Sequence, residues 1–396
     1  MLFDADISSL SDLIEPMSPQ EFLDYYVKQV PVFVHGGHPR RAKALINAHE
    51  LSDIVHQGLH PDGRIGMFQN GKPIPSQCYS TLDTRPRTDP AAVRRLLSGG
   101  ASLVLNGLDE LHPKIGDLCH ALELEFASNV WANAYVTVNE FRAFDTHFDD
   151  HDVIVLQISG VKRWKLFGKT EEFPLHPRGA LPQSPSEEIQ TDIVSPGEVL
   201  FIPRGVWHRA EAVSTPAFHI TFGVGGVTGI DLVQGSIDEL SREPIFRKYL
   251  PRIGSAQALR DHEEKLKSYL HRWVDRLSGE VLLASIDLAR GNRSRVILWD
   301  QVRINCGTKL WIASRRMLPI EFLEGSDGRS IRMPRTSREF SRMSLLVLKI
   351  AFSRMVLSFE ELLTEVRAVE NTSAEADVVE AVRELVEHGL LNVEGA

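Results

Sequence analysis

The segment that decides the fold reads Phe144-Asp-Thr-His147-Phe-Asp149-Asp-His151-Asp152, and a run of β-type residues follows it at once. His147 and Asp149 are separated by one residue, so on a strand both side chains point to the same side. From Val130 to about Val224 the sequence alternates short β runs with Gly and Pro turns. Short strands at this spacing predict a barrel or a sandwich.

Local turn signals divide this region into five expected strands: residues 132–138, 153–158, 161–167, 199–202 and 217–224. Ser159-Gly160, between the second and third strands, predicts a tight hairpin. Pro196-Gly197 and Pro203-Arg-Gly205 predict further turns. Residues 61–94, by contrast, are rich in Pro and polar residues and are expected to form loop.

A third candidate metal ligand, His208, follows the Pro203-Arg-Gly205 turn. Two histidines and one carboxylate can bind one face of Fe(II) and leave the opposite positions open for an organic cosubstrate and O2. Asp150, His151 and Asp152 compete for the same role, and His151 shares the face of His147 if the strand is regular. The combination of His-x-Asp with a later Pro-x-Gly-x-x-His favours His147, Asp149 and His208.

Lys162 lies on the strand expected after the hairpin, beside the strand of the metal site. A lysine that faces into a barrel needs an anionic partner, because an unpaired buried charge is costly. The distal carboxylate of 2-oxoglutarate would supply that partner. The alternative is that Lys162, Arg163 and Lys165 form a solvated basic strand.

Several stretches together resemble the JmjC-type cupin oxygenases and, within them, the bacterial ribosomal oxygenases: residues 18–26, 133–135, 147–153, 157–164, 196–210 and 218–223. The resemblance implies an α+β fold, a double-stranded β-helix (cupin barrel) with N-terminal helices, a helical dimerisation segment and a C-terminal winged-helix domain. It places the catalytic domain at residues 1–227, the dimerisation segment at 228–324 and the winged-helix-like domain at 325–396.

Carried over residue by residue, the resemblance implies that His147, Asp149 and His208 bind Fe(II) and that Lys162 pairs with the distal carboxylate of 2-oxoglutarate. The implied activity is that of a dioxygenase that uses O2 and 2-oxoglutarate to hydroxylate a side chain, with release of succinate and CO2. The expected substrate is a protein, a ribosomal protein first, or a peptide.

Asn133 and Tyr135 match the family position whose side chains help to hold the cosubstrate, and Thr221 and His219 are weaker candidates for the same pocket. The chain departs from the family between Tyr135 and His147, where ribosomal oxygenases usually carry a Thr-Pro-Pro and Gly-rich stretch. Because this segment lies next to the metal and shapes the substrate entrance, the departure leaves the substrate open, and a peptide acted on during natural-product maturation is an alternative.

Composition restricts the partners and the compartment. The chain has 396 residues and a formal net charge of −9, which disfavours nucleic-acid binding by the whole surface. Its three cysteines form no CxxC pair, and no apolar run approaches the ~20 residues of a membrane span, so we expect a cytoplasmic protein without a membrane partner.

The C-terminal residues predict three helices, at 341–352, 358–368 and 375–388, and a strand at 390–393. This order is typical of a winged helix. The third helix carries five acidic residues and one arginine, so phosphates would repel it, and we expect no direct DNA binding. Two other functions remain open: a non-redox metal-binding cupin that acts as a sensor or isomerase, and a winged-helix regulator whose cupin senses a ligand.

Overall fold

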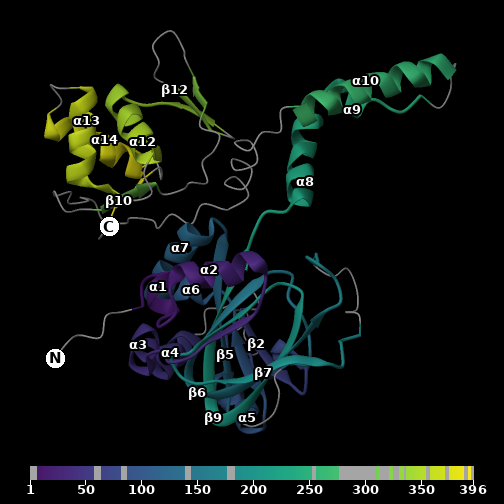
Figure 1. The fold of residues 1–396 in the computed structure, drawn as a ribbon, viewed down its shortest axis with the longest axis vertical. Helices are drawn as coiled ribbons and strands as arrows, with labels where there is room; N and C mark the ends of the chain where they lie inside the picture. Colours follow the sequence, from purple (N-terminus) through teal and green to yellow (C-terminus); the bar gives the residue numbers. More distant parts are fainter. Residues whose placement is uncertain are drawn as a thin grey trace. The chain divides into compact units, whose positions relative to one another are not determined.

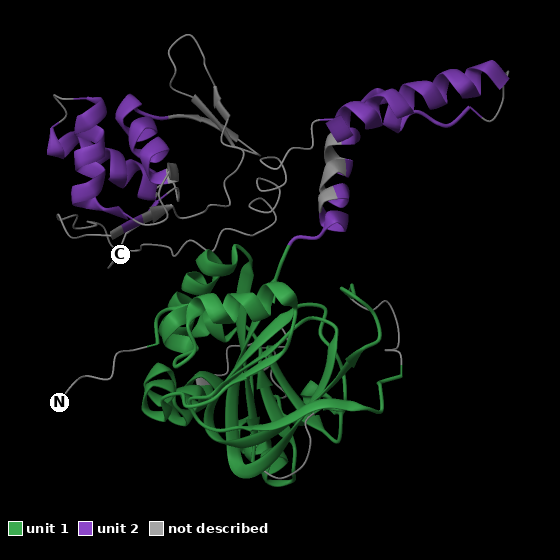
Figure 2. Ribbon diagram, in the orientation of Figure 1, with its two compact units in different colours: residues 1–226 green, residues 227–396 purple. Residues whose placement is uncertain are grey.

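The computed structural model of this chain describes residues 7–57, 64–81, 87–138, 144–175, 183–251, 256–275, 309–312, 321–323, 330–333, 336–353, 357–370, 374–387 and 391–393. The chain divides into two compact units, residues 1–226 and residues 227–396 (Figure 2). In the first unit a large antiparallel sheet is covered on one side by helices (Figure 1).

The first unit contains nine strands within its described residues: β1 (Val32–Val34), β2 (Ile65–Gln69), β3 (Lys72–Ile74), β4 (Ser102–Leu105), β5 (Asn129–Thr137), β6 (Asp152–Lys169), β7 (Glu188–Val194), β8 (Val199–Ile202) and β9 (Val206–Gly225). Its helices are α1 (Leu10–Leu13), α2 (Pro19–Lys28), α3 (Pro39–Leu45), α4 (Ala48–Gln57), the 3-10 helix η1 (Ser76–Cys78), α5 (Pro90–Ser98), α6 (Leu108–Leu111) and α7 (Pro113–Phe126). The strands pair antiparallel in the order β1-β8-β6-β9-β5-β4-β2-β3, and β7 pairs with β6.

Two long strands, β6 and β9, organise the sheet because each takes part in two sets of pairings. The first half of β6 lies between β8 and the second half of β9, whereas its second half lies between β7 and the first half of β9. Side chains from both halves of β6 pack together in one interior cluster, which includes Val153, Val155, Trp164 and Leu166. The double use of two strands produces the predicted antiparallel cupin architecture.

The predicted hairpin at Ser159-Gly160 is wrong, because β6 runs through this dipeptide without a turn. The pairing with β9 shifts its register on both sides of Ser159, so the strand is irregular here and still continues. Gly160 has φ +65°, and a Cβ atom there would lie 2.5 Å from the Pro216 carbonyl oxygen of β9. The glycine therefore allows close approach of the neighbouring strand, and tertiary pairing overrides the local turn signal.

The expectation of loop over residues 61–94 is also wrong in part, because β2, β3 and the start of α5 lie in this range. The turn between β2 and β3 is Asn70-Gly71, both with positive φ, which is a strong hairpin signal. Elsewhere the predicted strand at 199–202 is confirmed as β8, and β5 overlaps the prediction at 132–138. The first half of β9 was not predicted, because residues 209–216 mix polar and small residues without an apolar run and are half-buried or exposed.

The opposite face of the sheet packs against the N-terminal helices. Ile154 and Leu156 of β6 belong to a large cluster with residues of α1, α2 and α7, such as Leu10, Phe22 and Leu118. Alternate residues of β6 therefore face the helices and the barrel interior, and both sets are buried. This arrangement explains the nearly continuous apolar run that follows Asp152.

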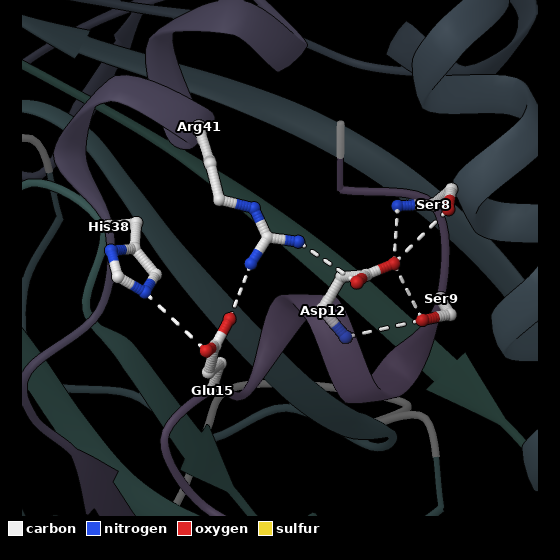
Figure 3. A network of polar contacts seen from close by, with 6 residues as sticks. All are labelled: Ser8, Ser9, Asp12, Glu15, His38 and Arg41. Carbon is white, nitrogen blue, oxygen red and sulfur yellow. Dashed lines mark hydrogen bonds and ion pairs between the residues drawn. The ribbon is translucent and has the colours of Figure 1, made fainter. Parts of the chain in front are cut away.

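A buried arginine ties α1 to α3 (Figure 3). Arg41 is only 8% exposed, and its guanidinium pairs with the carboxylates of Asp12 (2.9 Å) and Glu15. Asp12 also accepts hydrogen bonds from Ser8 and Ser9, and these bonds lower the pKa of its carboxyl group against the opposing effect of burial. The network joins α1 and the turn after it to α3.

The second unit contains α8 (Gly229–Leu240), α9 (Pro244–Arg247), α10 (Ala256–Asp275), β10 (Lys309–Ile312), β11 (Glu321–Leu323), β12 (Ser330–Met333), β13 (Thr336–Glu339), α12 (Arg342–Ser353), β14 (Leu357–Ser358), α13 (Phe359–Val369), α14 (Glu375–Glu387) and β15 (Leu391–Val393). The three predicted C-terminal helices are present as α12, α13 and α14, and they share one apolar core. β14, β10 and β15 form a small antiparallel sheet beside them. The assignment as a winged helix and the boundaries at 228 and 325 stay predictions.

None of the helices described in the structure combines the length and apolar character that a membrane crossing requires.

The Arg41 network predicts a loss of stability when its cation is removed. Arg41→Met keeps much of the side-chain volume but removes the cation shared by the half-buried Asp12 and the more exposed Glu15, so the free energy of unfolding should fall by about 1–3 kcal/mol. Urea unfolding followed by circular dichroism would measure the change. The neighbouring Arg40 is exposed, so Arg40→Met serves as the control, and equal stability of the two variants would contradict the assigned role.

Candidate metal centre and cosubstrate pocket

Three of the predicted site residues meet at one point of the barrel. His147, Asp149 and His208 each offer one ligand atom, and these atoms lie within 4.8 Å of one another. The backbones of His147 and His208 exchange two hydrogen bonds, with N···O distances of 3.1 and 2.7 Å. This isolated bridge places the segment before β6 beside the start of β9, so the two histidine rings lie 4.5 Å apart.

Each histidine of the cluster has one ring nitrogen occupied by the backbone. Nδ1 of His147 lies 2.8 Å from the carbonyl oxygen of Asp145, and Nδ1 of His208 lies 3.0 Å from that of Val206. A carbonyl can only accept, so both Nδ1 atoms carry a hydrogen, and Nε2 is the ring position left on each histidine for a metal. Metal-binding histidines are commonly oriented in this way.

The residues next to the ligands pack on the other side of the chain. Phe148 and Trp207 are buried, and their rings meet edge to face at 5.0 Å in a small cluster with Phe167. The indole N–H of Trp207 donates to Thr170 at 2.9 Å. Because side chains alternate in extended backbone, this packing directs the three candidate ligands toward the barrel interior.

The electrostatics of the cluster suit a divalent cation. Burial, together with the neighbouring His147, lowers the pKa of His208 to about 4, so its imidazole is neutral at physiological pH. Asp149 contributes one carboxylate, whose Oδ2 lies 3.5 Å from Nε2 of His208. Two neutral imidazoles and one carboxylate are the donor set that non-heme Fe(II) sites use.

The competing candidates in the same segment are engaged elsewhere. Nδ1 of His151 lies 2.9 Å from the Asp150 carboxylate, and its ring packs against Trp131 at 4.7 Å. Asp152 accepts hydrogen bonds from the backbone N–H of Arg204 and from the side chain of Gln29. Within the described residues, the set that could hold a metal is therefore His147, Asp149 and His208.

Lys162 is buried in the barrel interior, with 4% of its surface exposed, so the solvated-strand alternative does not hold for this residue. Its Nζ lies 2.8 Å from Nδ1 of His219, and no carboxylate of the described chain is within ion-pair distance. Burial lowers its pKa to about 7. A buried amine without a counter-ion fits the site of an anionic ligand, because a carboxylate would restore the missing partner.

The other predicted pocket residues lie on β5 and β9, in the part of the sheet that contains His219. Asn133 and Tyr135 of β5 lie opposite Thr221 and His219 of β9 in the strand register. The Tyr135 hydroxyl bonds to the side chains of Thr221 and Asn133, and burial together with the charge of Asp149 raises its pKa to about 12. Oδ1 of Asn133 also accepts the backbone N–H of Gly107, so part of its role is to hold the α6 region.

Two features of the pocket were not predicted. The buried indole N–H of Trp164 has no hydrogen-bond partner in the described structure, and its ring lies 6.0 Å from that of His208 and 5.5 Å from that of His219. Lys162 lies two residues before Trp164, so both side chains point to the same face of β6. This spacing is the sequence signal that could have placed Trp164 in the pocket. Phe144 lies beside His147 (5.7 Å) and packs on Phe68 of β2 (4.6 Å), an arrangement that required the tertiary structure.

The departing segment between Tyr135 and His147 includes residues 139–143, which lie outside the described residues.

Comparisons with known proteins show which families this chain resembles. Residues 110–232 match the JmjC domain family. Ribosomal oxygenase 2 of Rattus norvegicus is 24% identical over 308 residues, which cover 73% of this chain and 64% of the relative. A Drosophila persimilis protein named bifunctional lysine-specific demethylase and histidyl-hydroxylase NO66 is 34% identical over 220 residues, or 54% of this chain and 31% of the relative.

Solved structures show the same fold. The Escherichia coli ribosomal oxygenase YcfD, in a complex with cobalt and 2-oxoglutarate, aligns with a TM-score of 0.56 at 18% identity over 94% of this chain and 98% of that chain. The chain spans between 25% and 64% of the length of the first curated relatives that it matches. Together, the site geometry and these comparisons identify residues 110–232 as a JmjC domain, in a chain that resembles the ribosomal oxygenases along most of its length.

Proposed function

We propose that this chain is an Fe(II)- and 2-oxoglutarate-dependent dioxygenase that hydroxylates a side chain of a protein or peptide. The observation that carries the proposal is the coexistence, in one barrel, of the His147–Asp149–His208 cluster and a buried lysine that has no carboxylate partner within the described chain. Bound Fe(II), 2-oxoglutarate and O2 would supply the oxidising power, and succinate and CO2 would leave as co-products.

The chain's own residues bind, orient and shield the reacting groups. The Nε2 atoms of His147 and His208 and the carboxylate of Asp149 would hold the metal on one face. Lys162 would pair with the distal carboxylate of the cosubstrate. Tyr135 and Thr221 would line the pocket that holds the cosubstrate. Trp164, which borders both His208 and His219, would offer its free N–H to the bound anion.

A ribosomal protein is the first substrate class that we propose, because the relatives that match most of this chain are named ribosomal oxygenases. The net charge of −9 suits a basic target. Phe144 and Phe68 form an aromatic surface beside His147 against which a target side chain can pack. We place the enzyme in the cytoplasm, consistent with three cysteines that form no CxxC pair in the sequence.

The second unit would serve assembly and protein docking rather than DNA binding. Helix α8 exposes Ile230, Val233 and Ile237, with 49%, 54% and 58% of their surfaces accessible, and this spacing forms one apolar stripe. We propose that α8 and α10 form the dimerisation segment and pair with a second copy of the chain. The C-terminal helices would form an acidic winged helix, and Glu375, Asp377 and Glu380 on α14 would repel phosphates.

The cofactor assignment predicts a charge-transfer band when 2-oxoglutarate is added to the anaerobic Fe(II)-loaded protein. His208→Ala removes one ligand and should abolish the band. Lys162→Ala should keep metal binding but require at least about tenfold more 2-oxoglutarate, since a charge-assisted contact is lost. Visible spectroscopy measures both effects. Metal binding without any band in the wild type would favour the non-redox cupin instead.

The pKa of Lys162 predicts how the affinity for 2-oxoglutarate depends on pH. A carboxylate binds the ammonium form, and the pKa of about 7 means that this form is lost as the pH rises above 7. The dissociation constant should therefore be level below pH 7 and rise about tenfold per unit above it. Spectroscopic titration between pH 6.5 and 9 would measure this. In Lys162→Arg the cation persists, so its profile should be flat, and a flat wild-type profile would contradict the prediction.

The apolar stripe of α8 predicts that the wild-type chain of 44.4 kDa elutes as a dimer of about twice that mass. Val233→Asp combined with Ile237→Asp introduces charges into the proposed interface and should give monomers by light scattering. Val27→Asp, at an equally apolar site on α2 that is 78% exposed, is the matched control. A monomeric wild type, or a double variant that stays dimeric, would contradict the proposal.

A further inference from the structure

The partner of Lys162 is a histidine rather than an acid. Nζ of Lys162 lies 2.8 Å from Nδ1 of His219, and both side chains are almost completely buried, with 4% and 3% of their surfaces exposed. If two adjacent buried bases both carried a positive charge, desolvation and mutual repulsion would cost a large free energy. Burial and the nearby ammonium lower the pKa of His219 well below its usual range, so its ring is neutral. Because an ammonium only donates, Nδ1 is the acceptor and Nε2 carries the hydrogen.

Neighbouring rings hold the imidazole of His219 in one orientation. Tyr135 of β5 stacks on it, with ring centroids 4.9 Å apart and planes inclined by 4°. Trp164 of β6 meets it edge to face at 5.5 Å. Tyr135 is itself held by Thr221 and Asn133, so the chain of contacts runs across three strands. The Nδ1 lone pair consequently has a fixed direction.

We propose that His219 is a positioning residue that holds the ammonium of Lys162 in place to receive the distal carboxylate of 2-oxoglutarate. A lysine side chain is flexible, with about four rotatable bonds. Without an acceptor, the Lys162 side chain would adopt other rotamers, or its ammonium would lose its proton in the apolar interior. A carboxylate in the place of His219 would neutralise the ammonium and compete with the cosubstrate. A neutral acceptor orients the charge and leaves it available. This inference rests on the proposed function.

The groups that face the pair make this assignment specific to His219. From β5, the hydroxyl of Tyr135 stays protonated because its pKa is about 12. From β6, Trp164 contributes an uncharged ring. Beyond these rings, the charge of Asp149 acts on Tyr135, and the neutral ring of His208 lies against Trp164. His219 is thus the acceptor that the described structure offers to Lys162.

Two substitutions distinguish the role of His219 as a hydrogen-bond acceptor from the role of its ring in packing. His219→Asn places an amide oxygen near the position of Nδ1 but removes most of the stacking surface. His219→Phe keeps an aromatic ring against Tyr135 but removes the acceptor. His49→Phe, at a side chain that is 88% exposed, is the matched control outside the pocket.

The measurement is an anaerobic titration of each Fe(II)-loaded protein with 2-oxoglutarate, followed by the charge-transfer band from pH 6 to 9. His219→Phe should raise the dissociation constant at pH 7 about tenfold or more, because the oriented ammonium is lost. Its pH profile should also move toward lower pH, since the charged form of Lys162 loses its acceptor. His219→Asn should retain both the affinity within about threefold and the wild-type profile. A purely structural role would predict the reverse order.

The outcomes distinguish this inference from the proposed function. If the wild type gives no band with 2-oxoglutarate, both proposals fall. If the wild type binds and His219→Phe matches it in affinity and pH profile, only the role of His219 is overturned. Should His219→Phe not fold, nitrogen NMR of the histidines in the wild-type apoprotein provides the test. A neutral Nε2–H ring at His219, assigned by its absence in His219→Asn, is expected at pH 6, where Lys162 is an ammonium. A ring protonated at Nδ1 would overturn the proposal.

Discussion

The backbone bridge between His147 and His208 is the contact on which the site depends. Its two hydrogen bonds join a segment just before β6 to the start of β9, and both long strands then diverge into the two halves of the barrel. Because the pairing fixes the backbone at both positions, it holds the side chains of His147 and His208 next to each other, with ring centroids 4.5 Å apart.

The packing outside the barrel and the chemistry inside it are coupled through single residues. Phe148 stands between His147 and Asp149, and Trp207 precedes His208, so the aromatic contact on one face sets the direction of the ligands on the other. The turn before β9 adds to this control, because the backbone N–H of Gly205 donates to the carbonyl of Asp149. Substitutions in this outer cluster would therefore disturb the ligand cluster without touching it.

The sequence contained local information about strands and motifs but not about register. The His-x-Asp and Pro-x-Gly-x-x-His motifs could be read directly, since each is a short segment with a characteristic spacing. Ser159-Gly160 was misread because a bend inside a long strand and a two-residue hairpin share the same residue types. The contact between Lys162 and His219 was invisible for a related reason: it crosses an irregular stretch of β6, where simple alternation no longer predicts which residues face each other.

Charge balance explains why this interior tolerates polar groups at all. Its rings, from His208, His219, Tyr135 and Trp164, are neutral, so the charges that remain are the Asp149 carboxylate and the Lys162 ammonium, which are of opposite sign. A divalent metal and a dicarboxylate would add two positive and two negative charges, so loading would leave the net charge of the pocket unchanged. Burying either partner alone would leave an uncompensated charge of two units, which is costly in an apolar interior. Metal and cosubstrate should accordingly bind cooperatively. The neutral His219 is the acceptor that holds the ammonium of Lys162 in position for the cosubstrate.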